Sequence, residues 1–223
     1  MKDKSLWVVG TAFLGGALLL TAGCSTTDSG PVVGSGSVRT EERKIETFKA
    51  IEAGGAIELE VAAQREPSVE VSIDDNLVRF VETQVSGDTL RVKTTQEYRL
   101  NIPLKVKVGV PVLSSLKVSD ASRANVTGAS GEKIELNTSG AARVKIEGFT
   151  NNLNVQATEA SVVDAEGLRA TNVIVKAIGA SNATVFAAES IGAEATGASR
   201  VTYAGNPKTV TKNASGASSV SPK

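Results

Sequence analysis

Apolar and polar residues alternate along most of the chain, and after Ser114 the alternation returns at a nearly constant interval. Each repeat is centred on an alanine that stands among small polar residues. The six central alanines, spaced 18 to 20 residues apart, are Ala121, Ala141, Ala160, Ala180, Ala198 and Ala217. A repeat of this length and regularity indicates a solenoid, in which every repeat forms one coil.

The residues on either side of each central alanine predict two strands. Three and five residues before it, and again three and five after it, most side chains are apolar or small, whereas the positions between them are polar. Before the alanine these columns are Leu116, Leu136, Val155, Val175 and Ala193, with Val118, Thr138, Ala157, Ala177 and Ala195. After it they are Ala124, Val144, Val163, Ala183 and Val201, with Val126, Ile146, Ala165, Val185 and Tyr203. Period two is typical of a strand with one buried face.

Each repeat therefore predicts a strand, a small-residue corner, a second strand and a turn. The turns are marked by Gly128, Gly148, Gly167 and Gly205. A coil of about 19 residues, at roughly 3.3 Å per residue, can surround only a narrow core, so coils must stack on one another. We predict an all-β fold, a right-handed parallel β-solenoid (β-helix) from Ser114 onward. An antiparallel meander is the alternative.

Two positions carry more specific expectations. If the central alanine lies in a crowded corner, Ala180→Leu should destabilise the fold by a few kcal/mol. In the last repeat, Lys212 occupies a column that is apolar in the other repeats. A charge at an inward position of a terminal coil discourages the addition of further strands.

Residues 45–113 are rich in alternating patterns but less regular, and Ile57, Leu59 and Val61 illustrate the alternation. The segment IEAGGAIEL is similar to a corner repeat with Gly54 in the central position. Residues 73–85 predict an insertion between that corner and the regular coils. We predict an irregular N-terminal β section that closes one end of the core, with the path of residues 62–113 left open.

The first 23 residues resemble a bacterial lipoprotein signal peptide, because Lys2 and Lys4 precede an apolar run that ends shortly before Cys24. This predicts lipidation of Cys24 and attachment of the exported protein to a membrane. An ordinary secretory signal and a single membrane span are the alternatives. Similarity to Gram-negative lipoproteins, through Ser25, favours the outer membrane; in other bacteria we expect the exterior of the cell membrane. Residues 24–40 predict a flexible tether and residues 41–223 a single domain.

Composition excludes several kinds of chemistry. The chain has no histidine and one cysteine, so the commonest general base is missing and no disulfide can form within the chain. Removal of residues 1–23 takes two of 24 basic and one of 24 acidic side chains, which leaves 22 against 23. A near-neutral domain has no bulk attraction to nucleic acid. We expect no catalytic residue, no metal, no cofactor and no nucleic-acid partner.

Two carboxylate features could still carry chemistry. Asp120 and Glu159 occupy the same column, immediately before the central alanine, and would lie two coils apart. The motif IDDN at residues 73–76 could supply oxygen ligands to calcium. For both we favour a structural interpretation: a solvent-facing polar corner for the first, and ordinary turn chemistry for the second.

The outward columns offer a repeating polar surface. Serine and threonine recur two residues before the central alanine, and serine recurs one residue after it. These hydroxyls either cap backbone groups at the corner or present a surface to a glycan or another polymer. On the preceding strand, Asn137, Gln156 and Lys176 should stand in line on successive coils. We predict that these three residues form a partner-contact strip.

Several segments resemble one bacterial family. These are FKAIEAGGAIELEV, NLVRFVETQVSGDTLRV, VPVLSSLKVSDAS, TSGAARVKI, AIGASNATV and ATGASRVTY. Over about residues 45 to 220 the chain resembles the family called putative auto-transporter adhesin, head GIN domain. The resemblance implies an exported β-helical domain and supplies no catalytic residue.

The function expected from these features is non-enzymatic binding or adhesion at the cell envelope or surface, with a glycan or another envelope component as partner. The alternative is a polysaccharide lyase or hydrolase built on a β-solenoid. Such an enzyme would need carboxylates or an Arg/Lys pair converging in a groove.

Overall fold

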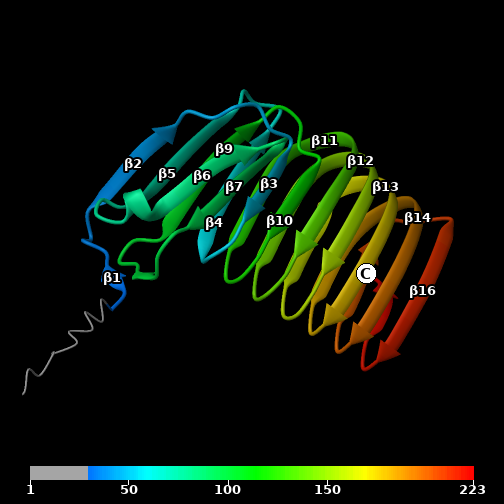
Figure 1. Cartoon of the computed structure of the whole chain (residues 1–223). Coiled ribbons are helices and arrows are strands. Elements are labelled where there is room, and N and C mark those ends of the chain that lie inside the picture. The colour runs from blue at the N-terminus through cyan, green and yellow to red at the C-terminus, as the bar shows by residue number, and fades with distance from the viewer. Residues whose placement is uncertain (1–29) are drawn as a thin grey trace, which may run out of the picture. The chain divides into compact units, whose positions relative to one another are not determined.

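The computed structural model describes residues 30–223, which are built almost entirely of β-strands (Figure 1). Pro31–Lys223 form one compact unit. Its C-terminal part is the predicted stack of coils. The strands of this part are β10 (Ser115–Val118), β11 (Arg123–Thr138), β12 (Arg143–Ala157), β13 (Val162–Gly179), β14 (Asn182–Gly197), β15 (Arg200–Ala204), β16 (Thr209–Gly216) and β17 (Ser219–Pro222).

All neighbouring coils pair in parallel, and the residues of each predicted apolar column lie opposite one another on neighbouring strands. Leu116 lies beside Leu136, which lies beside Val155, and the same column continues through Val175 to Ala193. These side chains are at most 4% exposed, so the alternating positions do form the core. The parallel β-solenoid is confirmed, and the antiparallel meander is excluded for this part of the chain.

The turns predicted at Gly128, Gly148 and Gly167 are bends within strands and do not end them, whereas β15 ends just before Gly205. β11 to β14 each run from one corner to the next, and their pairing shifts register near the bend, for example between Val126 and Ala129. At Gly148 the backbone φ is 145°, and a Cβ there would overlap the carbonyl of Ala129 on the coil below. Each coil thus has a first leg after the corner, a short side beyond the bend, and a second leg that returns to the next corner.

The corners differ from the prediction in which side chain enters the core. The residue before each central alanine has a left-handed backbone; φ is 62° at Asp120, 69° at Gly140 and 61° at Glu159. This conformation turns the central alanine outward, and Ala180 is exposed. The residue after it points inward instead. These fully or almost fully buried residues are Ser122, Ala142, Ser161, Ser181 and Ser199. The expectation that Ala180→Leu would crowd the corner is therefore wrong.

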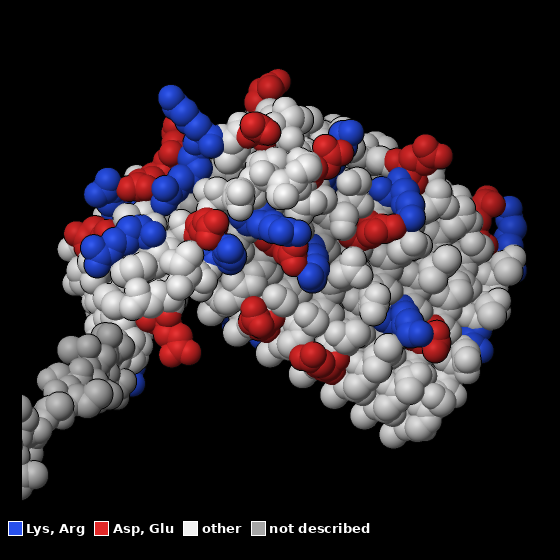
Figure 2. Space-filling view, in the orientation of Figure 1, with Lys and Arg blue, Asp and Glu red and all other residues white. Residues whose placement is uncertain are grey.

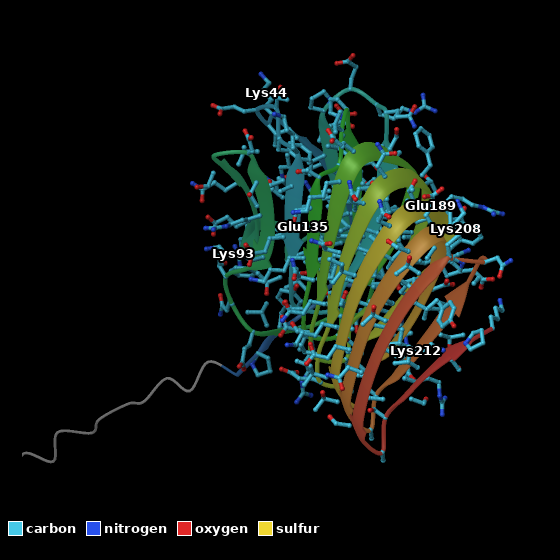
Figure 3. The ribbon with its side chains drawn as sticks, turned by 90° about the vertical axis from the view of Figure 1, so that its right-hand side faces the viewer. Lys44, Lys93, Glu135, Glu189, Lys208 and Lys212 are labelled. Atoms are coloured by element: carbon cyan, nitrogen blue, oxygen red, sulfur yellow. The ribbon has the colours of Figure 1, made fainter. Side chains whose placement is uncertain are left out.

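The last coil leaves one end of the core open. Every residue of β16 is exposed, and Lys212 lies in register with the buried Ala193. The Lys212 ammonium group lies 4.9 Å from the centre of the Tyr203 ring, and Figure 3 looks onto this end with Lys212 labelled. A cation over an aromatic face is attracted by the ring quadrupole. Lys212 therefore occupies the inward column of the terminal coil, as its sequence position predicts.

The N-terminal part continues the same sheets with longer excursions. Its elements are β1 (Val32–Val33), β2 (Val38–Arg43), β3 (Ala50–Ala53), β4 (Ile57–Ala63), β5 (Ser68–Asp74), the 3₁₀-helix η1 (Val78–Phe80), β6 (Val81–Ser86), β7 (Thr89–Thr94), β8 (Tyr98–Arg99) and β9 (Leu104–Val110). β3 pairs with β10 and β4 with β11, so Gly54 lies at the corner of a first coil. The predicted insertion, residues 73–85, spans the end of β5, η1 and most of β6.

The expected tether, residues 24–40, needs a correction at its C-terminal end. β1 pairs with β8, and β2 pairs with β5 in an antiparallel ladder that includes Val38 opposite Asp74. Residues 31–43, which we call the strap, are thus part of the folded unit. The buried carboxylate of Asp74 joins the strap to residues 101–102, because it accepts hydrogen bonds from Gly36 N at 2.7 Å, Ile102 N at 3.1 Å and Asn101 N at 3.2 Å.

Candidate functional site

The three residues predicted to contact a partner stand in one line on the second leg. Asn137 on β11 lies in register with Gln156 on β12, and Gln156 lies in register with Lys176 on β13. Neighbouring parallel strands are about 4.8 Å apart, so the three side chains cover roughly 10 Å along the stack. We call Asn137, Gln156 and Lys176 the strip. The structure brings them together as the sequence repeat predicts.

A shallow hollow of about 270 Å³ lies along the strip. Glu135, Asn154 and Ile174, from the neighbouring outward column of the same three coils, complete its outward lining. Ile174 is 63% exposed, which gives this polar face one large apolar contact. The hollow therefore offers amide donors and acceptors beside one exposed apolar side chain.

Ion pairs lie at both ends of the strip, along the column of which it is part. In the same column, Glu52 receives a hydrogen bond from Lys117 at 2.6 Å and lies 3.3 Å from Arg91. The Lys117 hydrogen bond is the main cause that lowers the pKa of Glu52. At the other side Lys176 lies 3.3 Å from Glu194. The face seen in Figure 2 accordingly carries neighbouring blue and red side chains with white surface between them. Asn137 and Gln156 are thus the uncharged centre of the column.

Comparison with known families identifies the chain. The model of the family described as "Putative auto-transporter adhesin, head GIN domain" matches residues 47–207. The chain belongs to this family. The match includes the strip, the first coil at Gly54 and all the corners up to Ala198.

Solved structures share the fold of this head GIN domain. A putative adhesin from Bacteroides fragilis superposes with a TM-score of 0.72 at 19% identity, covering 86% of this chain and all of the other. A putative lipid binding protein from Parabacteroides distasonis gives 0.60 at 19% identity, over 87% of this chain and all of the other. A putative adhesin from Parabacteroides merdae gives 0.52 at 20% identity, over 86% of this chain and 98% of the other. No curated protein sequence matches the chain.

The serine column after the central alanines is structural in this head GIN domain. Ser161 Oγ donates to the carbonyl of Thr138 at 3.2 Å, Ser181 Oγ to that of Ala157 at 3.0 Å, and Ser199 Oγ to that of Ala177 at 3.0 Å. These hydroxyls tie each corner to the coil before it. Of the two alternatives given for these hydroxyls, capping of backbone groups at the corner is confirmed for this column. Its buried serines do not add to the binding surface.

The two carboxylate features have structural positions as well. Asp120 and Glu159 are exposed at corners where the backbone is left-handed, with Gly140 on the coil between them. In the IDDN motif, Asp74 binds backbone N–H groups of the strap and of residues 101–102, and Asn76 Nδ2 donates to the carbonyl of Val33 at 2.8 Å. Within residues 30–223, no group of three or more Asp, Glu or Cys side chains could hold a metal ion. The sequence does not reveal this fastening role of Asp74.

A second hollow, of about 1010 Å³, lies beside the turn that joins β4 to β5 and was not expected from the sequence. Arg43, Arg65, Glu70 and Lys107 are among its lining residues, and Lys107 lies 3.1 Å from Glu70. Basic and acidic side chains alternate around it, so the hollow has no single charge that would select an ionic ligand.

Cys24, the predicted lipidation site, lies outside the described residues. Among residues 30–223, no helix has the length and apolar character needed to cross a membrane.

Proposed function

We propose that this head GIN domain is a non-enzymatic binding module of the cell envelope or surface, exported and held at a membrane through lipid on Cys24. The strip is its contact surface, and a glycan or another envelope component is its partner. The observation that carries this proposal is the alignment of Asn137, Gln156 and Lys176 on three successive coils around one hollow with the exposed Ile174. Membership in an adhesin-named family supports it.

The strip favours repeated weak contacts over one tight site. A hydrogen bond to a polar ligand contributes about 1 kcal/mol net, so three such residues cannot give high affinity alone. Many copies anchored in one membrane would act together on a partner with repeating groups, because each bound copy raises the effective concentration for the next. Attachment through Cys24 and a shallow strip are therefore consistent with each other.

Replacing Asn137, Gln156 and Lys176 together with alanine should abolish most retention on immobilised envelope polysaccharide. The melting temperature should stay nearly unchanged, because the three side chains lie outside the core and the lost ion pair to Glu194 contributes at most about 1 kcal/mol. Retention and a glycan array measure binding, and differential scanning calorimetry measures stability.

The matched control carries alanine in place of Asn125, Lys145 and Asp164, which stand in register on the first legs of the same three coils. This control should bind as the wild type does. Equal binding by wild type and the strip variant would refute the strip as the contact surface. Assaying the incubated polysaccharide for new reducing ends or unsaturated products tests the lyase or hydrolase alternative, and any turnover would contradict a non-enzymatic role.

Cys24→Ala should move the protein from the membrane fraction to the soluble fraction, because a covalently attached lipid is the proposed anchor. The variant domain should keep its fold, since residues 31–223 form their own compact unit. Fractionation and mass spectrometry of Cys24 give the measurement. A Cys24→Ala protein that stays with the membrane would favour a spanning segment instead. In a Gram-negative host we expect the wild-type protein in the outer membrane.

A further inference from the structure

An outward column on the short side of the coils combines two aromatic rings with a cation. Phe149 lies in register with Arg169, and Arg169 with Phe186, so the three residues stand on successive coils. Phe149 is 60% exposed. The Arg169 guanidinium carbon lies 4.4 Å from the centre of the Phe186 ring. We call these three residues the aromatic ladder.

Core packing does not account for the aromatic ladder. Phe48, by contrast, is 1% exposed inside the core, whereas Phe149 leaves most of its ring in water. Stacking against Phe186 holds the Arg169 side chain along the surface, which limits the conformational freedom it would lose on binding. The ladder is thus a preformed apolar and cationic surface.

Arg169 retains its charge and its hydrogen-bond donors for a partner. The acidic residues near the ladder in the chain are each paired with a lysine: Glu147 with Lys145 at 2.8 Å, Glu166 with Lys223 at 2.6 Å, and Glu189 with Lys208 at 3.6 Å. Figure 3 shows Glu189 and Lys208 together on this side of the coil. Among the described ion pairs none includes Arg169, and its side chain is exposed.

Hydrogen-bonding side chains run parallel to the aromatic ladder. Asn152, Asn172 and Ser190 lie in register just beyond the short side. Asn172 Nδ2 donates to Asn152 Oδ1 at 3.4 Å, and Ser190 Oγ donates to Asn172 Oδ1 at 2.7 Å. Donors and acceptors therefore continue along the same three coils that carry the aromatic rings and the guanidinium.

We propose that the aromatic ladder is a second binding surface, and that its ligand is an acidic polysaccharide whose sugar rings carry carboxylates. The apolar C–H faces of sugar rings can pack on Phe149, while the Arg169 fork can donate two hydrogen bonds to one carboxylate. The asparagine column can bind ring hydroxyls. Charge complementarity at Arg169 distinguishes an acidic from a neutral glycan.

The shape of the surface favours a polysaccharide over a protein partner. The ladder is a row of side chains on the outside of the short side, and Phe149 borders none of the hollows described above. Protein interfaces usually depend on anchors that insert into pockets. A linear polymer can instead lie along the stack and contact the side chains of successive coils in turn. This inference extends the binding role proposed above to another face of the domain.

Alginate, a linear polyuronate, is the probe for the test, with dextran as the neutral glycan and poly-glutamate as an acidic peptide. The wild-type domain should bind alginate and should not bind dextran. Phe149→Ala and Arg169→Gln should each weaken alginate binding about tenfold, since one stacking contact or one charge-assisted pair contributes about 1.4 kcal/mol or more. Arg169→Lys should recover only part of the affinity, because it restores charge without the fork.

The strip variant with alanine at 137, 156 and 176 is the matched control and should bind alginate as the wild type does. A failure of the aromatic ladder and a failure of the strip can therefore be told apart. Phe149→Ala should melt within about 1 °C of the wild type, because the ring is outside the core. The inference is overturned if wild type does not bind alginate, if the ladder variants bind it normally, or if poly-glutamate binds equally well.

Discussion

Ser181→Leu should lower the melting temperature by about 5–10 °C. The Ser181 side chain is fully buried at a corner, and its hydroxyl donates to the carbonyl of Ala157 at 3.0 Å. Leucine adds carbon atoms where the coils allow no space, at a cost of about 1–3 kcal/mol, and removes a hydrogen bond that contributes about 1 kcal/mol. Calorimetry of the purified domain gives the measurement.

Two further variants locate the cause of that loss. Ala180→Leu should change the melting temperature by less than about 2 °C, because Ala180 is exposed on the other side of the same corner. Ser181→Ala should be milder than Ser181→Leu, since alanine already occupies the equivalent buried position at Ala142. If Ala180→Leu were as damaging as Ser181→Leu, the left-handed corner geometry would be contradicted.

Asp74→Ala should release the strap, residues 31–43, from the rest of the domain. The buried Asp74 carboxylate accepts hydrogen bonds from Gly36 N, Asn101 N and Ile102 N, and a hydrogen bond to a charged group contributes about 1.5–3 kcal/mol. Trypsin should then cleave after Arg39 and Arg43 at least about tenfold faster, because cleavage follows the population of the open form. Mass spectrometry of the fragments over time gives the rates.

Two other substitutions separate strap release from general damage. Asp75→Ala should change the cleavage rate little, since exposed Asp75 receives its side-chain hydrogen bond from the exposed hydroxyl of Ser35. Gly34→Ala should reproduce the release while keeping the acceptor, because a Cβ at residue 34 would overlap the Asp74 carboxylate. Protection of Arg39 in Asp74→Ala would show that the β2–β5 ladder holds the strap without the carboxylate.

The columns of the coil section were predictable because burial imposes period two on every strand. Leu116, Leu136 and Val155 could be aligned by counting from the central alanines, and the strip followed from the same count. The corner orientation was harder to predict. Asp120 and Glu159 share a column with glycines, and this was the available sign of a left-handed backbone, which turns the following alanine outward.

The aromatic ladder and the strap could not be predicted in the same way. Phe149 stands eight residues after its central alanine, Arg169 nine after and Phe186 six after, so no common count aligns them. Register shifts at the bend bring them together. The strap contains the serines and glycines of a flexible linker at residues 34–37, and its hydrogen-bond partners are distant in the sequence: Asn76 lies 41 residues from Ser35, and Asn101 lies 67 residues from Gly34.

The strap also determines how the domain would respond to force. A pull on the chain before residue 31 loads β1 and the Asp74 hydrogen bonds first, then the β2–β5 ladder, before it reaches the coils. Detachment of 13 residues would extend the chain by roughly 40 Å. If the protein is tethered to one surface and bound to another, detachment of the strap would lengthen the connection before the load unfolds any coil. The coils that carry the strip and the aromatic ladder would then stay folded.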